Sequence, residues 1–355
     1  MSASLVHFAV CDDVLRASGL ADGMEKRLLE AWRRFPNFAR LGSVGPDLPY
    51  YETPVKDGLK MKLDINIPIQ PHGYLLHTKE PNVFATKLFH IIEADGPNEA
   101  SDGLLAFAAG YLTHLATDYV IHPYVNDQAG KYYVSEEHQR THRLIEIYQD
   151  VYLFRKMYEK TAQGEDQDVG DAFRKKDLEA KIDVPGESAL LGGWDTQRSL
   201  RMLFQRAFLE THGIHITEQN VEDWFDGMSK TLRVLNKNVS PYTRALHKPE
   251  DQWANKAYPP GVFFGDQDPI VALTTQMWKD ETAKPSPLTG NASSASALQV
   301  ENNKSLYGRA IARGVKYLQA ASAYLMNHDY RAFVDAIPGN DLSDPLGGEP
   351  AVAGH

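Results

Sequence analysis

Three side chains that could bind a metal recur at intervals of four residues in an apolar part of the chain. His114, Asp118 and His122 lie in the segment GYLTHLATDYVIHPYVN of residues 110–126, directly after the apolar run LLAFAA. On an α-helix a step of four residues turns about 400°, so two such steps drift by only about 80° and the three side chains share one face. The spacing therefore predicts a stripe of imidazole and carboxylate groups along a buried helix.

A second set has the same spacing. His138, His142 and Glu146 lie in the segment EEHQRTHRLIEIY of residues 136–148. Two helices that each present nitrogen and carboxylate ligands from one face can enclose a metal, and this donor set suits zinc. Taken alone, a His–Asp pair four residues apart is an ordinary helix ion pair, worth about a few tenths of a kcal/mol. The two sets together favour a metal site, because buried charge without a partner is costly.

Two connecting segments add further candidate ligands. Asp47 lies in a restricted turn between Pro46 and Pro49, and His77 lies in a loop just ahead of an expected helix start. Loops on a rigid scaffold commonly carry functional groups. Taken alone, Asp47 is more typical of a turn or cap residue and His77 of a hydrogen-bonded polar side chain.

The elements that must position these side chains are helices. Apolar residues recur at three- and four-residue intervals, and no series of alternating strands occurs, so we expect an all-α fold. A charged run over residues 163–188 is typical of a surface excursion, and residues 283–303 are rich in Pro, Ser, Asn and Gly. The predicted helices cover residues 24–32, 83–92, 104–121, 144–157, 200–209, 221–235 and 306–326.

Composition excludes several classes of protein. The formal net charge of -10 over 355 residues argues against a nucleic-acid partner and against an anionic membrane surface, both of which require clustered Lys and Arg. A single cysteine, Cys11, excludes an intrachain disulfide framework and a cysteine-rich zinc finger. No signal peptide and no run of about 18 apolar residues is seen, so we expect a cytoplasmic protein without a transmembrane segment. The sequence leaves the oligomeric state open.

The order of these motifs resembles the bacterial zinc-dependent phospholipase C family and, more distantly, the nucleases that share its all-helical zinc fold. The resemblance runs through His7, the Gly45-Pro46-Asp47 turn, the His77 segment and the two ligand-bearing helices, and so covers residues 1 to about 150. It implies a multi-helix phospholipase C/P1-nuclease-like bundle with a metal cluster between helices. One domain would span residues 1–337, with metal ligands in 1–150, packing helices and loops in 160–337, and a flexible tail over 338–355.

The resemblance also implies two or three Zn²⁺ ions and a hydrolytic reaction. A metal-bridging hydroxide would attack the phosphorus of a phospholipid-like or small phosphodiester substrate, with Asp47 and Asp118 as catalytic residues. Asp47 would orient or deprotonate the nucleophile, and Asp118 would bridge two metals. The first metal would be held by Asp47, His77, His114 and Asp118, the second by His122, His142 and Glu146, and the third by His7 and Asp118.

This sequence departs from the family pattern at two places. The family's N-terminal residue, which contributes its amine and carbonyl to the third metal, lies further from the matching histidine than Met1 lies from His7, so that site is either incomplete or closed differently. Asp118 and His122 are also closer together than the matching pair, so that His122 could ligate another metal and His138 could replace it. Two alternatives to the phosphodiesterase stay open: a nuclease on the same zinc framework, and a helical protein with structural or inactive metal sites.

Overall fold

The computed structural model describes residues 4–52, 71–98, 100–157, 194–238, 256–257, 259, 261–283 and 292–344. Every regular element within these ranges is a helix, which confirms the predicted all-α fold. In chain order these elements are α1 (Ser4–Ser18), α2 (Lys26–Arg34), α3 (Pro36–Gly42), the 3₁₀ helix η1 (Gly45–Tyr51), α5 (Pro71–Thr78), α6 (Pro81–Asp95), α7 (Ser101–Ala129), α8 (Glu136–Met157), α11 (Trp194–His212), α12 (Glu218–Asn238), α15 (Pro269–Ala283), α16 (Ala292–Ala297), the 3₁₀ helix η3 (Val300–Asn302), α17 (Leu306–Asn327) and α18 (Tyr330–Asp335).

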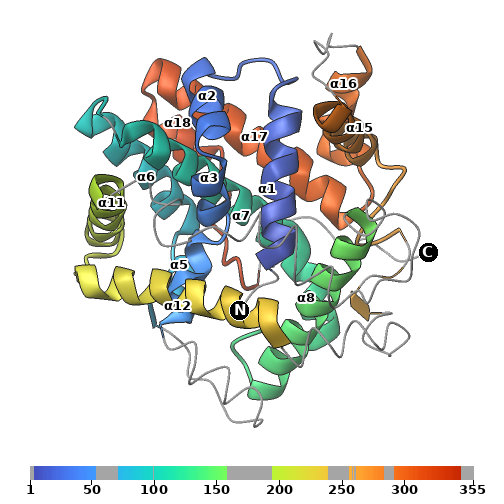
Figure 1. Cartoon of the computed structure of the whole chain (residues 1–355), viewed down its shortest axis with the longest axis horizontal. Coiled ribbons are helices and arrows are strands. Elements are labelled where there is room, and N and C mark those ends of the chain that lie inside the picture. Colours follow the sequence, from blue (N-terminus) through green and yellow to red (C-terminus); the bar gives the residue numbers. More distant parts are fainter. Residues whose placement is uncertain are drawn as a thin grey trace.

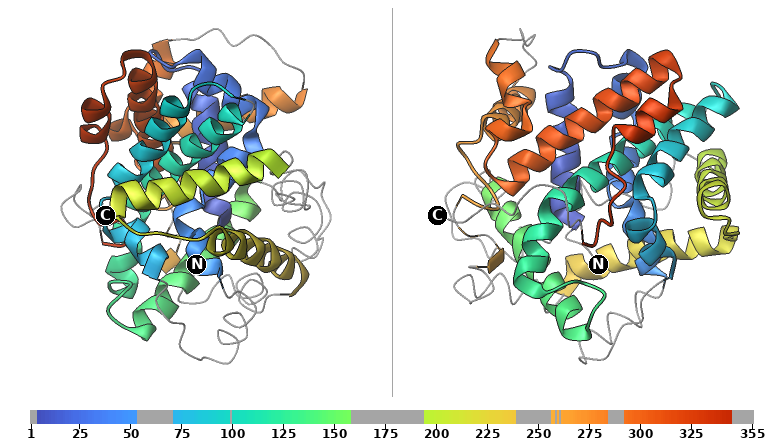
Figure 2. Two further views of the ribbon diagram at one scale, coloured as in Figure 1. Left: turned by 90° about the vertical axis from the view of Figure 1, so that its left-hand side faces the viewer. Right: turned by 180° about the vertical axis from the view of Figure 1, so that it is seen from behind.

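Helix α7 forms the centre of the bundle. It packs most extensively against α3 and α17, and further against α2, α6, α8 and α1 (Figure 1). Nearly all side chains from Ser101 to His122 are buried, because neighbouring helices cover α7 on every side. Helix α12 crosses the lower half of the bundle in Figure 1, and the left view of Figure 2 shows α11 and α12 on the side that faces the viewer. The predicted stripe of His114, Asp118 and His122 therefore lies on the most enclosed helix of the protein.

By length and composition α7 could also cross a membrane. Its most apolar window of 18 residues has a mean hydropathy of 1.3, and 94% of that window is buried within the protein. Such burial is typical of a core helix, where hydrophobic residues surround the whole helix.

Two glycines allow α3 and α7 to approach unusually closely. A Cβ atom on Gly110 would lie 1.8 Å from the carbonyl oxygen of Ala39, and one on Gly42 would lie 2.0 Å from that of Phe107. No larger residue fits at either position without separating the helices. The approach places Ser43 and the start of η1 against α7, which positions Asp47 beside the stripe.

Helix α1 is oriented by a carboxylate from α8. The Asp150 side chain accepts a hydrogen bond of 2.9 Å from the backbone N–H of Val6, within the first turn of α1. N–H groups in a first helical turn have no partner within the helix, and a carboxylate there also interacts favourably with the helix dipole. Asp150 thereby fixes the end of α1 that carries His7.

All seven predicted helices are confirmed, most of them longer at both ends than the periodic pattern suggested. The expected loop around His77 is wrong, because this residue lies in the last turn of α5. Asp47 lies in η1, a tight 3₁₀ turn that contains both flanking prolines. The charged run of residues 163–188 lies outside the described residues.

The start of the expected tail needs correction. Residues 338–344 pack against the bundle, with Leu342 only 1% exposed, since their backbone forms hydrogen bonds with α5 and α7. Figure 2 shows this segment running from α18 back toward the centre of the protein. Residues 345–355 lie outside the described part of the chain, and a single domain over 1–337 stays a prediction.

Candidate metal centre

Five elements bring eight candidate ligands together. Helices α1, α5, α7 and α8 and the turn η1 contribute residues that are each at most 7% exposed. In each of three groups the ligand atoms lie within 4.8 Å of one another, a separation at which one cation can be bound, and two of the groups share His114. These groups are His7, His114 and Asp118; Asp47, His77 and His114; and His122, His142 and Glu146.

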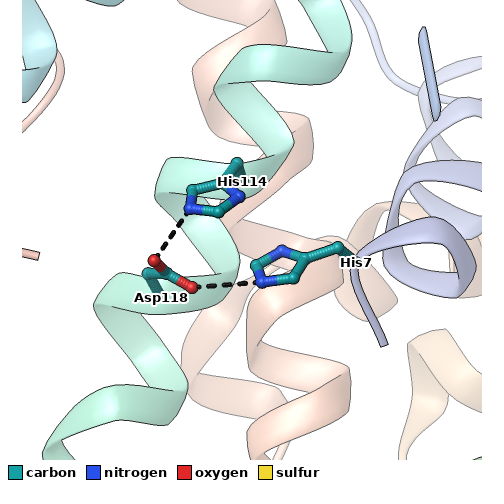
Figure 3. Close-up of side chains that lie close together, drawn as sticks. All are labelled: His7, His114 and Asp118. Carbon is teal, nitrogen blue, oxygen red and sulfur yellow. Dashed lines mark ion pairs between the residues drawn. The ribbon is translucent and has the colours of Figure 1, made fainter. Parts of the chain in front are cut away.

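Asp118 connects the three groups. Its Oδ2 atom lies 2.9 Å from Nε2 of His114, and its Oδ1 atom lies 3.3 Å from Nε2 of His7 (Figure 3). The same two oxygens lie 3.7 Å from Nε2 of His77 and 3.5 Å from Nε2 of His122, respectively. One carboxylate is therefore within reach of four imidazoles on three helices, the geometry required of a bridging ligand.

The turn η1 and helix α5 face the same part of α7. Oδ1 of Asp47 lies 3.3 Å from Nε2 of His77, and both residues share a group with His114. The imidazoles of His7 and His114 stack in parallel with their centroids 4.2 Å apart. His114 therefore lies between the group that contains Asp47 and the group that contains His7.

The third group joins α7 to α8. Oε1 of Glu146 lies 3.2 Å from Nε2 of His142 and 3.4 Å from Nε2 of His122. The rings of His122 and His142 meet edge to face at 4.9 Å. This group has the membership predicted from the sequence, with His122 retained despite its closer spacing to Asp118.

The histidine tautomers fit a metal site. The Nδ1 atoms of His77, His114 and His122 lie 2.7, 2.8 and 2.6 Å from the backbone carbonyls of Gly73, Ser43 and Leu342. Because a carbonyl can only accept, each Nδ1 carries the proton, and in the neutral ring the Nε2 lone pair faces the cluster. This arrangement of an outer hydrogen bond and an inner free nitrogen is typical of metal-binding histidine.

The carboxylates stay ionised despite their burial. Burial alone would raise the pKa of Asp47, but the hydrogen bond from His77 and the nearby imidazoles hold it well below its usual range. The pKa of Asp118 is likewise lowered, because His114 and His122 outweigh the effect of burial. In Glu146 burial also acts to raise the pKa, but the neighbouring His142 and His122 lower it to about 2. Three buried negative charges require compensation by cations or by protonated imidazole.

The imidazoles divide into two kinds. Burial, with the neighbouring His114, lowers the pKa of His7 to about 4, and burial also lowers that of His142. Burial acts in the same direction on His122, but the charges of Asp118 and Glu146 outweigh it and raise the pKa to about 9. Without a cation, His122 would thus be protonated at neutral pH and compensate part of the negative charge.

His138 does not join the centre within the described residues. Its Nδ1 atom lies 3.2 Å from the carbonyl of Lys131, and its ring packs over Gly130. The predicted substitution of His138 for His122 therefore has no support in the geometry, because His138 faces the connection between α7 and α8.

Tyrosine side chains complete the surroundings of the centre. Tyr50 and Tyr133 join their hydroxyl groups, and the ring of Tyr50 lies 5.6 Å from that of His77. Tyr132 packs on His142 at 4.9 Å and accepts hydrogen bonds from Arg143. This row of aromatic rings borders two of the three groups. In the sequence, the pair Tyr132-Tyr133 between the two ligand-bearing helices was a feature that could have indicated this border.

Comparison with known proteins agrees with this geometry. A family model described as zinc-dependent phospholipase C matches residues 6–185, which are 180 of the 355 residues and include all eight candidate ligands. No curated protein and no solved structure is significantly similar to the chain.

Proposed function

Since the chain belongs to the zinc-dependent phospholipase C family, we propose that it is a zinc-dependent hydrolase that cleaves a phosphodiester bond in a phospholipid-like substrate. The observation that carries this proposal is that His114 belongs to two of the buried groups of ligand atoms, while the carboxylate of Asp118 also approaches His77 and His122. One structural zinc needs four closed ligands, whereas this centre offers eight, three of them carboxylates.

The proposed ligands follow the contacts. Asp47, His77, His114 and Asp118 would hold one zinc ion, and His122, His142 and Glu146 a second. His7 with Asp118 would hold a third, and His114 lies close enough to contribute. The N-terminal residue, which the family pattern would add to this third site, lies among residues 1–3, outside the described part of the chain.

When bound, closely spaced zinc ions would supply positive charge that stabilises the attacking and leaving oxygens of a phosphodiester, and would lower the pKa of bound water. Water would attack phosphorus, and its proton would pass to the ionised carboxylate of Asp47 and from there to the leaving oxygen as the ester bond to the leaving alcohol breaks. Asp118 orients the imidazoles on either side of it, and the backbone carbonyls of Ser43 and Gly73 keep Nε2 of His114 and His77 aimed at the centre. The products are an alcohol and a phosphomonoester.

Charge favours a lipid or small phosphodiester over nucleic acid. The protein carries a formal charge of -10, and single-strand nucleases use a basic groove to follow the backbone. The family also suggests a lipid, and the row of tyrosines beside His77 and His142 offers an apolar border to the centre.

The test combines metal content with turnover. We would measure zinc per chain in protein purified without chelator, and hydrolysis of an aryl phosphodiester, phosphatidylcholine vesicles and single-stranded DNA. We expect two or three zinc ions and hydrolysis of the aryl and lipid esters. His114→Ala and His142→Ala should lose zinc and turnover, whereas His138→Ala, a matched histidine outside the centre, should keep both.

Each contrary result has a definite meaning. Wild-type protein that is folded but binds no zinc would refute the proposal. Zinc without turnover on any ester would favour structural or inactive sites, and preferential cleavage of DNA would favour the nuclease.

A further inference from the structure

The segment of residues 338–344, here termed the C-terminal strap, touches two of the candidate zinc ligands. It follows α18 and the buried Ile337, and its residue Leu342 is 1% exposed. The strap is far in sequence from both ligand helices, so its position requires specific contacts.

Leu342 contacts both ligands through its backbone. Its N–H donates to the carbonyl oxygen of His77 at 2.7 Å, and its own carbonyl accepts from Nδ1 of His122 at 2.6 Å. His77 lies on α5 and His122 on α7, and they belong to different groups of the centre. One residue of the strap therefore joins two ligand-bearing helices.

Other contacts hold the strap in place at some distance from the ligands. Asn126 donates from Nδ2 to the carbonyl of Ser343, and Nζ of Lys131 lies 2.6 Å from Oδ2 of Asp344. Just before the strap, Nδ2 of Asn82 donates to the carbonyl of Ile337 at 3.0 Å. These tethers come from α6, α7 and the residues after α7, and none of the three side chains is a candidate ligand.

The contact with His122 has a chemical consequence. A backbone carbonyl cannot donate, so it fixes the proton of the neutral ring on Nδ1 and leaves Nε2 free. That Nε2 atom lies 3.4 Å from Glu146 and 3.5 Å from Asp118, where it can bind a cation. Hydrogen bonds of this kind to ligating histidines typically change metal affinity about 10- to 100-fold.

We propose that the C-terminal strap is a positioning element of the metal centre, in which the backbone of Leu342 fixes His122 for zinc and ties it to α5. This inference rests on the proposed zinc-dependent function. A purely structural role for Leu342, as an apolar side chain in the core, would lower the stability of the metal-free protein but leave zinc affinity and the His122 tautomer unchanged.

Two truncations separate these roles. A chain that ends at Asp344 keeps every described contact of the strap, and a chain that ends at Ile337 removes them. Zinc affinity is measured by competition with a chromophoric chelator, at a temperature where circular dichroism shows each chain folded. We expect the chain ending at Asp344 to bind zinc as the full chain does, and the chain ending at Ile337 to bind the most affected zinc about 10- to 100-fold more weakly.

A gentler variant covers the case in which the shorter chain does not fold. The double variant Asn126→Ala/Lys131→Ala loosens the strap and leaves Leu342 and every ligand intact, and Lys131→Arg is the conservative control. We expect weaker zinc binding in the double variant only. We also expect its ¹⁵N spectrum, recorded on metal-free protein above pH 9 where His122 is neutral, to show loss of the Nδ1–H form of this ring. The His122 signals are identified by their absence in His122→Ala.

The outcomes distinguish the two proposals. Wild-type protein that binds no zinc would overturn both the strap and the zinc-dependent function. Wild-type protein that binds zinc, with unchanged affinity and His122 tautomer in every folded variant, would overturn the strap alone.

Discussion

Oδ2 of Asp118 lies 2.9 Å from Nε2 of His114, one turn away on the same buried helix, and Oδ1 of the same carboxylate lies 3.3 Å from Nε2 of His7 on α1. An ordinary helix ion pair joins one carboxylate to one basic side chain on the same helix. Here one buried carboxylate meets imidazoles from two helices, as a ligand shared between cations requires. This relationship distinguishes a metal centre from two isolated ion pairs.

Replacement of Asp118 by Asn should remove more than one ligand contact. Asp118→Asn keeps the size of the side chain but loses its charge, and this carboxylate faces four imidazoles. We expect loss of at least one zinc per chain and a fall in turnover of at least about 100-fold. Zinc analysis and hydrolysis of an aryl phosphodiester provide the check, with His138→Ala as the control. Full zinc content in Asp118→Asn would contradict the bridging role.

His7→Ala should have a narrower effect than Asp118→Asn. His7 contacts the centre through Asp118 and by stacking on His114, and it belongs to only one group of ligand atoms. We expect this variant to lose one zinc and to keep those held by the other two groups. The measurement is the number of zinc ions per chain in His7→Ala and in wild type. An unchanged count of two ions in both proteins would show that the site at His7 binds no zinc.

The sequence indicated the side chains of the centre better than the elements that carry them. The stripe on α7 was predictable because side chains four residues apart lie on the same face of a helix. Helix α1 was missed, since it is buried from Leu5 to Val14 and so shows no alternation of polar and apolar faces. Helix α5 has only eight residues, too few for a periodic pattern to form.

Backbone contacts explain what could not be predicted. The carbonyls of Ser43, Gly73 and Leu342 orient three imidazoles, yet any residue type can provide a carbonyl. Leu342 in particular lies in a stretch rich in Gly, Asp and Pro, a composition typical of a frayed tail. Its role depends on the distant segments that it meets in the folded chain.

Zinc binding should release protons at neutral pH. The pKa of His122 in the metal-free protein is raised to about 9, so at pH 7.5 zinc must displace its proton. Apparent zinc affinity should therefore rise with pH up to about 9. The raised pKa also means that the contribution of His122 to metal-free stability is complete below about pH 6.5 and is lost as the pH rises through 9.

Calorimetry in buffers of different ionisation enthalpy measures the protons released. We expect fewer protons at pH 9.5 than at pH 7.5, and fewer at pH 7.5 in His122→Gln than in wild type. Equal proton release at the two pH values would show that His122 is neutral before zinc binds.

Gly110→Ala should destabilise the whole centre without touching a ligand. The added methyl group would lie 1.8 Å from the carbonyl of Ala39, a backbone atom that cannot rotate away, so α3 must separate from α7. We expect a loss of at least about 3 kcal/mol in the free energy of unfolding, with lower zinc content because η1 moves with α3. Denaturant unfolding in chelator measures the first effect and zinc analysis the second. Gly19→Ala is the control, since its methyl would meet its nearest neighbours, including the flexible end of Arg33, at 3.3 Å. Equal stability of the two variants would show that α3 and α7 can separate without cost, and equal zinc content would show that their close approach does not position Asp47.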